Sequence, residues 1–164
     1  MSEVLSLKAK PLAAMAFKPY GDVIETTGVS PKVINQGFAQ RFNDLCKVEM
    51  GDGAVNVSLF TANPRPRPIA IKLMERHPLG SQAFIPMQDQ PWLVLVSDDP
   101  RDLATYHLFA ATGRQGINYA RNVWHHPLLV FDAGSSFLIV DRKGPGDNLE
   151  EVWLPEDWQV TVGG

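Results

Sequence analysis

The residues best suited to chemistry lie in one stretch, Gly116–Pro127, which contains two adjacent histidines, His125 and His126. Imidazoles titrate near neutral pH, so they can transfer protons or bind a metal ion under physiological conditions. Arg121 and Tyr119 add a cation and a phenol to the same stretch. Neighbouring residues of an extended chain point to opposite faces, so at most one of the two imidazoles faces a given cavity. A structural role for the pair, at the entry to a strand, is the alternative.

A second group of titratable residues, Glu75, Arg76 and His77, follows an apolar segment. The alternation within Ile69–Leu73 predicts a strand whose other face carries Lys72. If that strand continues, Glu75 and His77 share one face and Arg76 points the other way. A carboxylate and an imidazole on one face suit a pair of metal ligands or a general acid and base. The alternative is a surface salt-bridge cluster with little effect on stability.

The composition is that of an ordinary globular protein, because 45% of the 164 residues are apolar and 20% are charged. This length predicts one domain spanning residues 1–164. The net charge of -3 provides no basic surface for nucleic acid, and no apolar run approaches the roughly 20 residues of a membrane span. Met1–Lys10 lacks the apolar core of a signal peptide, and Cys46 is the only cysteine. We therefore expect a cytoplasmic protein without membrane or nucleic-acid partners.

The elements that must position these residues are short strands. Glycine and proline, 13 of each, interrupt the apolar runs, and the pattern predicts about ten strands and at most two short helices. The clearest strands are Ser81–Met87, Trp92–Val96 and Leu103–Ala110, and one or two helical turns are expected from Pro11 onward. This pattern indicates an all-β sandwich or barrel, which binds small molecules at its mouth.

Two pairs of apolar runs predict hairpins, namely Val48–Met50 with Ala54–Phe60 and Leu128–Phe131 with Phe137–Val140. In Ala54–Phe60 the polar residues alternate with apolar ones, and they face either solvent or a cavity wall.

The segment Val33–Cys46 is ambiguous, because its apolar residues have approximate helical spacing. Its glycine and asparagines favour strands and a turn. Arg41, which lies in this segment, is interpreted as a solvated surface charge. One or two last strands are expected around the turn at Pro155.

Six blocks of the sequence, in order along nearly the whole chain, resemble the ureidoglycolate lyase family. They are Phe17–Glu25, Glu75–Gly80, Gln82–Met87, Gly116–Tyr119, Arg121–Leu128 and the pair Asp141-Arg142. The resemblance implies a cupin-like β-barrel or jelly roll, which agrees with the strand pattern. It also implies a homodimer that binds a small-molecule substrate.

The reaction implied by the resemblance is the cleavage of (S)-ureidoglycolate to glyoxylate and urea in allantoin breakdown. The substrate's hydroxyl must lose a proton and the urea nitrogen must gain one, so the site needs a base, an acid and an anchor for the carboxylate. The candidates for proton transfer are Glu75, His77, His125, His126 and Tyr119. The candidates for substrate binding are Arg121, Arg76, Gln82, Lys72 and Asp141. Our hypothesis is that His77 and His125 face the cavity and that Arg121 holds the carboxylate in a bidentate pair.

The resemblance further implies a divalent metal, with nickel the associated ion, and His77 and His125 are the candidate ligands. The close-spaced His-x-His of the first cupin motif is not intact here, and Ala120 stands where some relatives are expected to carry histidine. A site that works without metal is therefore an alternative. Two other functions also fit a cupin-like barrel: a metal-dependent oxygenase or isomerase with three convergent imidazoles, and a small-acid-binding protein without catalysis.

Overall fold

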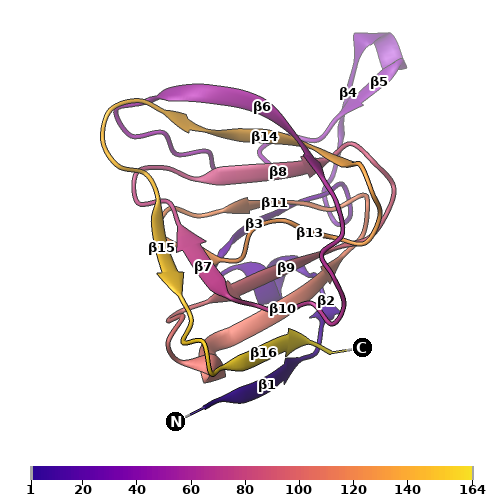
Figure 1. Cartoon of the computed structure of the whole chain (residues 1–164). Coiled ribbons are helices and arrows are strands. Elements are labelled where there is room, and N and C mark those ends of the chain that lie inside the picture. Colours follow the sequence, from indigo (N-terminus) through magenta and orange to yellow (C-terminus); the bar gives the residue numbers. More distant parts are fainter. Residues whose placement is uncertain (1, 164) are drawn as a thin grey trace.

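Two β-sheets face each other across a shared core in the computed structural model, which describes residues 2–163 (Figure 1). The larger sheet has the order β15-β7-β12-β9-β10-β2, with β13 also paired to β9. In that order its strands are Glu150–Trp153, Leu73–Arg76, Trp124–His125, Trp92–Ser97, Tyr106–Ala111 and Lys10–Pro11, and β13 is Leu129–Val130. The smaller sheet has the order β3-β11-β8-β14-β6, which comprises Gly21–Ile24, Gly116–Tyr119, Gln82–Pro86, Ser135–Lys143 and Ala54–Ala62.

Two strand pairs lie outside these sheets. The parallel pair β1 and β16 comprises Val4–Leu7 and Gln159–Val162, and the antiparallel pair β4 and β5 comprises Lys32–Ile34 and Ala39–Arg41. The helical elements of the described part are α1 and the 3-10 turns η1 and η2, which span Ala14–Phe17, Asn35–Gly37 and Leu103–Thr105. None of these helices is long and apolar enough to cross a membrane. The prediction of an all-β fold with one or two short helices is confirmed.

The core between the sheets explains the strongest sequence signals. Phe137 and Ile139 of β14 alternate inward and pack with Val94 and Val96 of β9, which faces them from the larger sheet. Leu95 of β9 points the other way, into a second apolar cluster on the outer side of the larger sheet. β9 is thus buried on both faces, which is why its sequence is apolar without interruption.

Both predicted hairpins are wrong, because long-range pairing decides the partners of these strands. β6 pairs with β14 along its whole length, and residues 48–50 form no strand. β13 pairs with β9 in the larger sheet, whereas β14 lies in the smaller sheet, so the turn between them carries the chain from one sheet to the other. A short turn between apolar runs is a local signal, and it does not distinguish a hairpin from a crossing between two sheets.

Three element boundaries also differ from the prediction. The strand expected at Ile69–Leu73 begins only at Leu73, because Ile69 and Ile71 are buried in the outer cluster and lie outside a continuous ladder. The first residues of Leu103–Ala110 form η2 rather than a strand. Gly116–Tyr119, which is not among the predicted strands, is the buried strand β11 between β3 and β8. The strands and turn favoured for Val33–Cys46 are confirmed as β4, η1 and β5.

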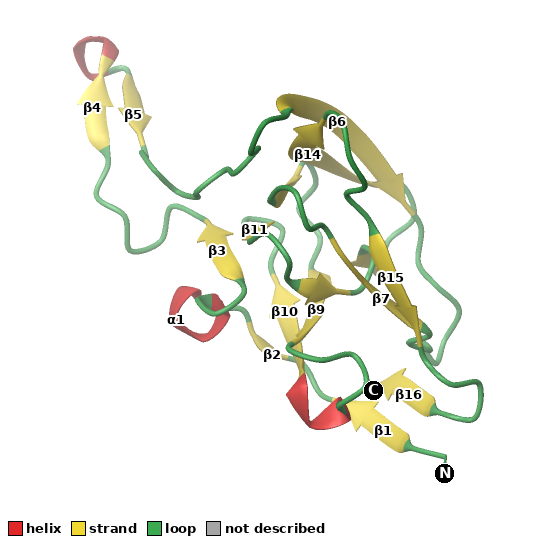
Figure 2. Cartoon of the chain, turned by 90° about the vertical axis from the view of Figure 1, so that its left-hand side faces the viewer, coloured by secondary structure: helices red, strands yellow, loops and turns green. Residues whose placement is uncertain are grey.

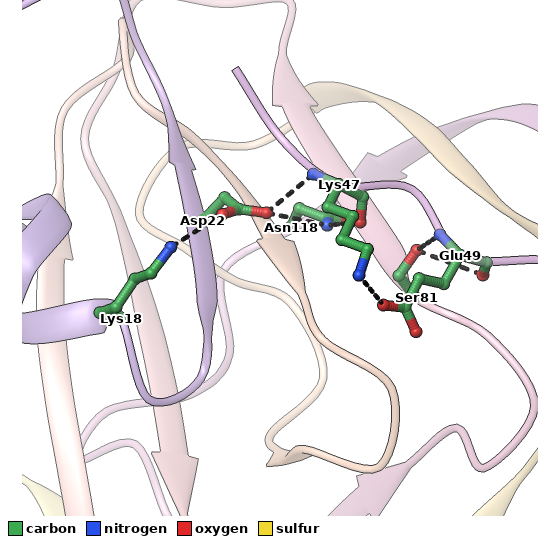
Figure 3. Close-up of polar contacts among 6 residues, drawn as sticks. All are labelled: Lys18, Asp22, Lys47, Glu49, Ser81 and Asn118. Carbon is green, nitrogen blue, oxygen red and sulfur yellow. Dashed lines mark hydrogen bonds and ion pairs between the residues drawn. The ribbon is translucent and has the colours of Figure 1, made fainter. Parts of the chain in front are cut away.

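A polar network attaches the segment before β6 to the smaller sheet (Figure 3). The backbone N–H of Lys47 donates to the Asp22 carboxylate over 2.9 Å, and the Asn118 amide donates to the Lys47 carbonyl over 2.8 Å. The Ser81 hydroxyl accepts from the backbone N–H of Glu49 over 2.8 Å. Residues 47–49 are therefore held against β3, β11 and β8, although they form no strand.

Arg142, at the end of β14, holds two loops together from a buried position. Its guanidinium donates to the carbonyls of Met50 and Pro145 over 3.1 and 2.8 Å and to the Asp52 carboxylate over 2.7 Å. The hydrogen bond and charge of Arg142 lower the pKa of the Asp52 carboxyl. This contact ties residues 50–53 to the loop that follows β14.

Replacing Arg142 with alanine is expected to lower the free energy of unfolding by about 2 kcal/mol, because it removes three hydrogen bonds and the packing of the buried stem. Urea denaturation measures the change. Arg101→Ala removes an exposed guanidinium and should change the stability by less than about 0.5 kcal/mol. Equal effects of the two substitutions would contradict a structural role for Arg142.

Candidate active site

One pocket, of about 410 Å³, opens between the two sheets, and the titratable residues that line it are Glu75, His77 and Asp147. It is lined by residues of β6, β7, β8, the segment before β13 and the loop after β14, namely Phe60, Glu75, His77, Gln82, Phe84, Pro127, Leu128, Asp147, Asn148 and Leu149. A larger cavity, of about 610 Å³, lies elsewhere and is lined mainly by apolar side chains. Arg67 is the only charged residue among those that line the larger cavity, so we place the candidate site in the smaller pocket.

Glu75, His77 and His125 form a cluster in which the potential metal-binding atoms all lie within 4.8 Å of one another. The ladder between β7 and β12 sets Glu75 directly opposite His125. His77 follows β7, and its ring centroid lies 5.2 Å from that of His125. The sheet therefore brings together two segments that are about 50 residues apart in the sequence.

The tautomers of both imidazoles follow from their backbone partners. The His77 Nδ1 lies 2.8 Å from the Asn148 carbonyl, and the His125 Nδ1 lies 3.0 Å from the Val123 carbonyl. A carbonyl only accepts, so each Nδ1 carries the hydrogen, and a neutral ring keeps its lone pair on Nε2. Both Nε2 atoms are buried and have no hydrogen-bond partner among residues 2–163, and that of His125 lies 3.5 Å from a Glu75 oxygen. Two lone pairs and a carboxylate directed at one point are the arrangement of a metal site.

Burial controls the protonation of this cluster. It lowers the pKa of His77, with the neighbouring His125 adding to the effect. Burial raises the pKa of the Glu75 carboxyl, but the His125 and His77 imidazoles outweigh it and leave that pKa lowered. Burial and the charge of Glu75 raise the pKa of Tyr119. At neutral pH these shifts favour a neutral His77 and an ionised Glu75, the forms that bind metal or accept a proton, and a Tyr119 that keeps its proton.

Three other predicted residues adjoin the cluster. The Tyr119 ring stacks on His125, with centroids 4.0 Å apart and planes inclined by 13°, so it fixes the imidazole from one side. The Gln82 amide donates to the Asp141 carboxylate over 3.1 Å, and Asp141 also accepts from Asn56 over 3.1 Å. These hydrogen bonds orient Gln82, which lines the pocket. Its Oε1 atom is buried and has no hydrogen-bond partner among the described residues.

The predicted cations lie elsewhere. Arg76 forms an ion pair with Glu150 over 2.8 Å and covers the Trp124 ring at 4.5 Å. Arg121 is exposed and donates to the Pro78 carbonyl. Lys72 is exposed as well, and none of the three belongs to the pocket lining.

His126 does not join the cluster either. It is buried, and its Nδ1 lies 2.7 Å from the Pro127 carbonyl, to which it donates a hydrogen bond. Burial lowers its pKa to about 4. The opposite orientation of the two adjacent imidazoles leaves His125 as the member of the pair that faces Glu75 and His77.

Comparisons with known proteins agree along nearly the whole chain. The family model described as ureidoglycolate lyase matches residues 4–161. The chain belongs to the ureidoglycolate lyase family.

Two curated members of this family show how close the similarity is. Ureidoglycolate lyase 1 of Rhizobium meliloti (strain 1021) is 50% identical over 163 residues, which cover 98% of this chain and 95% of that protein. Ureidoglycolate lyase of Burkholderia mallei (strain NCTC 10229) is 45% identical over 159 residues, which cover 95% and 94%. Among solved structures, the WlaRB TDP-quinovose 3,4-ketoisomerase from Campylobacter jejuni aligns with a TM-score of 0.46 and 15% identity, over 76% of this chain and 85% of that chain.

The structure also reveals residues of the candidate site that the sequence pattern did not indicate. The Asn148 carbonyl holds His77, and the Asn148 side chain accepts from the backbone N–H of Leu79 over 2.8 Å. Asn148 lies in a glycine- and proline-rich loop whose sequence gives no pattern that indicates a functional residue. Asn56, by contrast, lies on the polar face of β6, where it donates to Asp141, and Phe60 of the same face lines the pocket.

Proposed function

We propose that this member of the ureidoglycolate lyase family cleaves ureidoglycolate, in its (S) form, to glyoxylate and urea. The observation that carries the proposal is the cluster of Glu75, His77 and His125, with two buried and unpartnered Nε2 atoms beside an open pocket. The names of relatives that are 45 to 50% identical over nearly the whole chain support the choice of substrate. We also propose that residues 1–164 act as one domain, as a cytoplasmic homodimer.

The chemistry needs two proton transfers around one bond cleavage. The hydroxyl of the substrate loses its proton, the C–N bond breaks as the aldehyde C=O of glyoxylate forms, and the electron pair passes to the urea nitrogen, which gains a proton. Glu75, ionised, and His77, neutral, are placed to accept the hydroxyl proton, and the protonated group then donates to the nitrogen. The Gln82 Oε1 accepts from the N–H groups of the ureido moiety, which satisfies its missing partner.

The donor set alternatively fits a divalent metal, in which case the His77 Nε2 lone pair binds the ion and no longer accepts the hydroxyl proton. Glu75, His77 and His125 would hold the ion through one carboxylate and two Nε2 atoms, a set that suits nickel and other first-row ions. Such an ion, when bound, supplies Lewis-acid polarisation of a substrate oxygen and lowers the pKa of the hydroxyl it contacts. Asn148 and Val123 orient the two ligating rings through their Nδ1 hydrogens.

Incubation with (S)-ureidoglycolate tests the proposal. Glyoxylate and urea should form in equal amounts and well above the rate in buffer alone, and the (R) enantiomer should react far more slowly. Glyoxylate at the buffer rate, or ammonium in place of urea, would overturn the assigned reaction. A coupled assay for each product distinguishes these results.

A second candidate has one specific observation in its favour. Two imidazoles and one carboxylate are also the ligand set of non-haem iron oxygenases, although the cluster lacks the third imidazole expected for a cupin metal centre. Oxygen consumption with an iron-loaded protein would favour that function. A third candidate, a non-catalytic small-acid-binding protein, would show thermal stabilisation by ureidoglycolate without release of product.

A further inference from the structure

Residues 30–43 form a projecting hairpin, which we call the arm (Figure 2). It consists of β4, η1 and β5, and its tight turn has positive φ at Asn35, Gln36 and Gly37. Within the described chain, every hydrogen bond and strand pairing of the arm stays inside the arm. The neighbouring segment, by contrast, is attached to the barrel through Lys47 and Glu49.

The arm exposes apolar side chains that an isolated hairpin cannot bury. Phe38 at its tip is 91% exposed, and Val33 is 61% exposed. A two-stranded hairpin without a packing partner is at best marginally stable in water. The arm therefore needs a surface on which to pack.

The exposed row on β6 is such a surface. Val55, Val57 and Leu59 point outward and are 53% to 65% exposed, and β6 is the edge strand of the smaller sheet. Phe60 of the same strand points to the opposite face and lines the pocket, so a segment that packs along the free edge of β6 contacts the exposed row and reaches the mouth of the pocket. Edge strands with apolar side chains are sites of association.

The charges of the pocket and of the arm are complementary, which points to the arm as the segment that lies along β6. The residues that line the pocket include Glu75 and Asp147 but no lysine or arginine, although the proposed substrate carries a carboxylate. The only charged residues of the arm are the exposed Lys32 and Arg41. In Figure 2 the arm extends away from the barrel on the side opposite β7 and β15, and no residue of the arm is among those that line the pocket of the same chain.

We propose that the arm packs on β6 of a second copy of this chain and places Arg41 at the mouth of that copy's pocket, where the guanidinium holds the substrate's carboxylate. The exchange is reciprocal in a two-fold dimer, so each site is completed by its partner. The role of Arg41 rests on the proposed function, whereas the arm contact does not. The guanidinium and the carboxylate would form a bidentate pair.

The oligomeric state tests the arm contact by itself. In sedimentation equilibrium the wild type should be a dimer, and Phe38→Asp and Val33→Lys should be monomers with unchanged circular dichroism. Met15→Asp, a matched control that is also 91% exposed but lies on α1, should remain a dimer. A monomeric wild type, or dimeric arm variants at the same concentration, would overturn the contact.

Two co-expressed heterodimers, isolated by two affinity tags, test the role of Arg41. Arg41→Ala alone should lower kcat/KM about 100-fold, because it removes the clamp on the carboxylate. A dimer of one Arg41→Ala chain and one His77→Ala chain should recover about half of the wild-type turnover, since one of its two sites is intact. A dimer of one wild-type chain and one doubly substituted chain should be nearly inactive.

If the first heterodimer is nearly inactive and the second keeps about half of the wild-type turnover, Arg41 serves its own chain and the proposal is wrong. Wild-type kcat/KM in the Arg41→Ala protein would also overturn the proposal. The wild-type dimer is assayed for glyoxylate alongside. If it is inactive, the proposed function fails together with the assigned role of Arg41, while the sedimentation result still decides the arm contact.

Discussion

Replacing His77 with alanine is expected to lower kcat for ureidoglycolate cleavage by about 100-fold to 10,000-fold, the usual contribution of a positioned proton-transfer group. The His77 Nε2 is buried beside Glu75 and His125 and has no hydrogen-bond partner in the described part of the chain, so its lone pair is available to the substrate or to a metal. The substitution removes this lone pair but leaves Glu75 and Gln82 in the pocket. Steady-state measurement of glyoxylate release gives kcat and KM separately.

His107→Ala is the matched control. His107 is half-buried on β10, where its ring lies 6.0 Å from that of Tyr20, and it does not line the pocket. This variant should keep kcat close to that of the wild type. A wild-type kcat in the His77→Ala protein would remove His77 from the mechanism, and similar losses in both variants would indicate a general effect on folding.

Removal of divalent metal is expected to have the second large effect. Dialysis against a chelator should lower kcat at least about 100-fold, and nickel should restore it, because the cluster offers one carboxylate and two lone pairs to an ion. Glu75→Gln and His125→Ala should each reduce the metal bound per chain, which elemental analysis measures independently of activity. Loss of a ligand or of its supporting contact commonly costs 10-fold to 100-fold in metal affinity, by order of magnitude.

Glu156→Gln controls for the loss of a negative charge, because Glu156 is exposed in the turn before β16. It should retain the metal content of the wild type. Full activity of a protein shown to be free of metal would contradict the metal-assisted mechanism. It would leave Glu75 and His77 to transfer protons unaided.

The local pattern of the sequence predicted the orientation of individual side chains well. Alternation along an extended chain placed Glu75 and His77 on one face and Arg76 on the other, and the structure bears this out through the cluster and the Arg76–Glu150 ion pair. The same reasoning separated His125 from His126. The apolar run Trp92–Val96 likewise predicted a strand, and the structure shows this strand, β9, buried on both faces.

Partners that come from distant segments were not predictable in this way. Strand pairing depends on the complete set of competing strands, so the local hairpin signals failed at β6 and β13. The cations illustrate the same limit, since Arg121 and Arg76 carry the right chemistry but are held outside the pocket by Pro78, Glu150 and Trp124.

Residue identity and short-range periodicity are enough to indicate the family, the all-β class and the side-chain types available for proton transfer and metal binding. Which of those side chains meet depends on the pairing of distant strands. The pairing of β7 with β12 brings Glu75 and His125 together, and the loop at Asn148 directs the His77 lone pair toward them. Contacts of this kind join segments far apart in the chain, and their geometry is set by the packing of both sheets around one core.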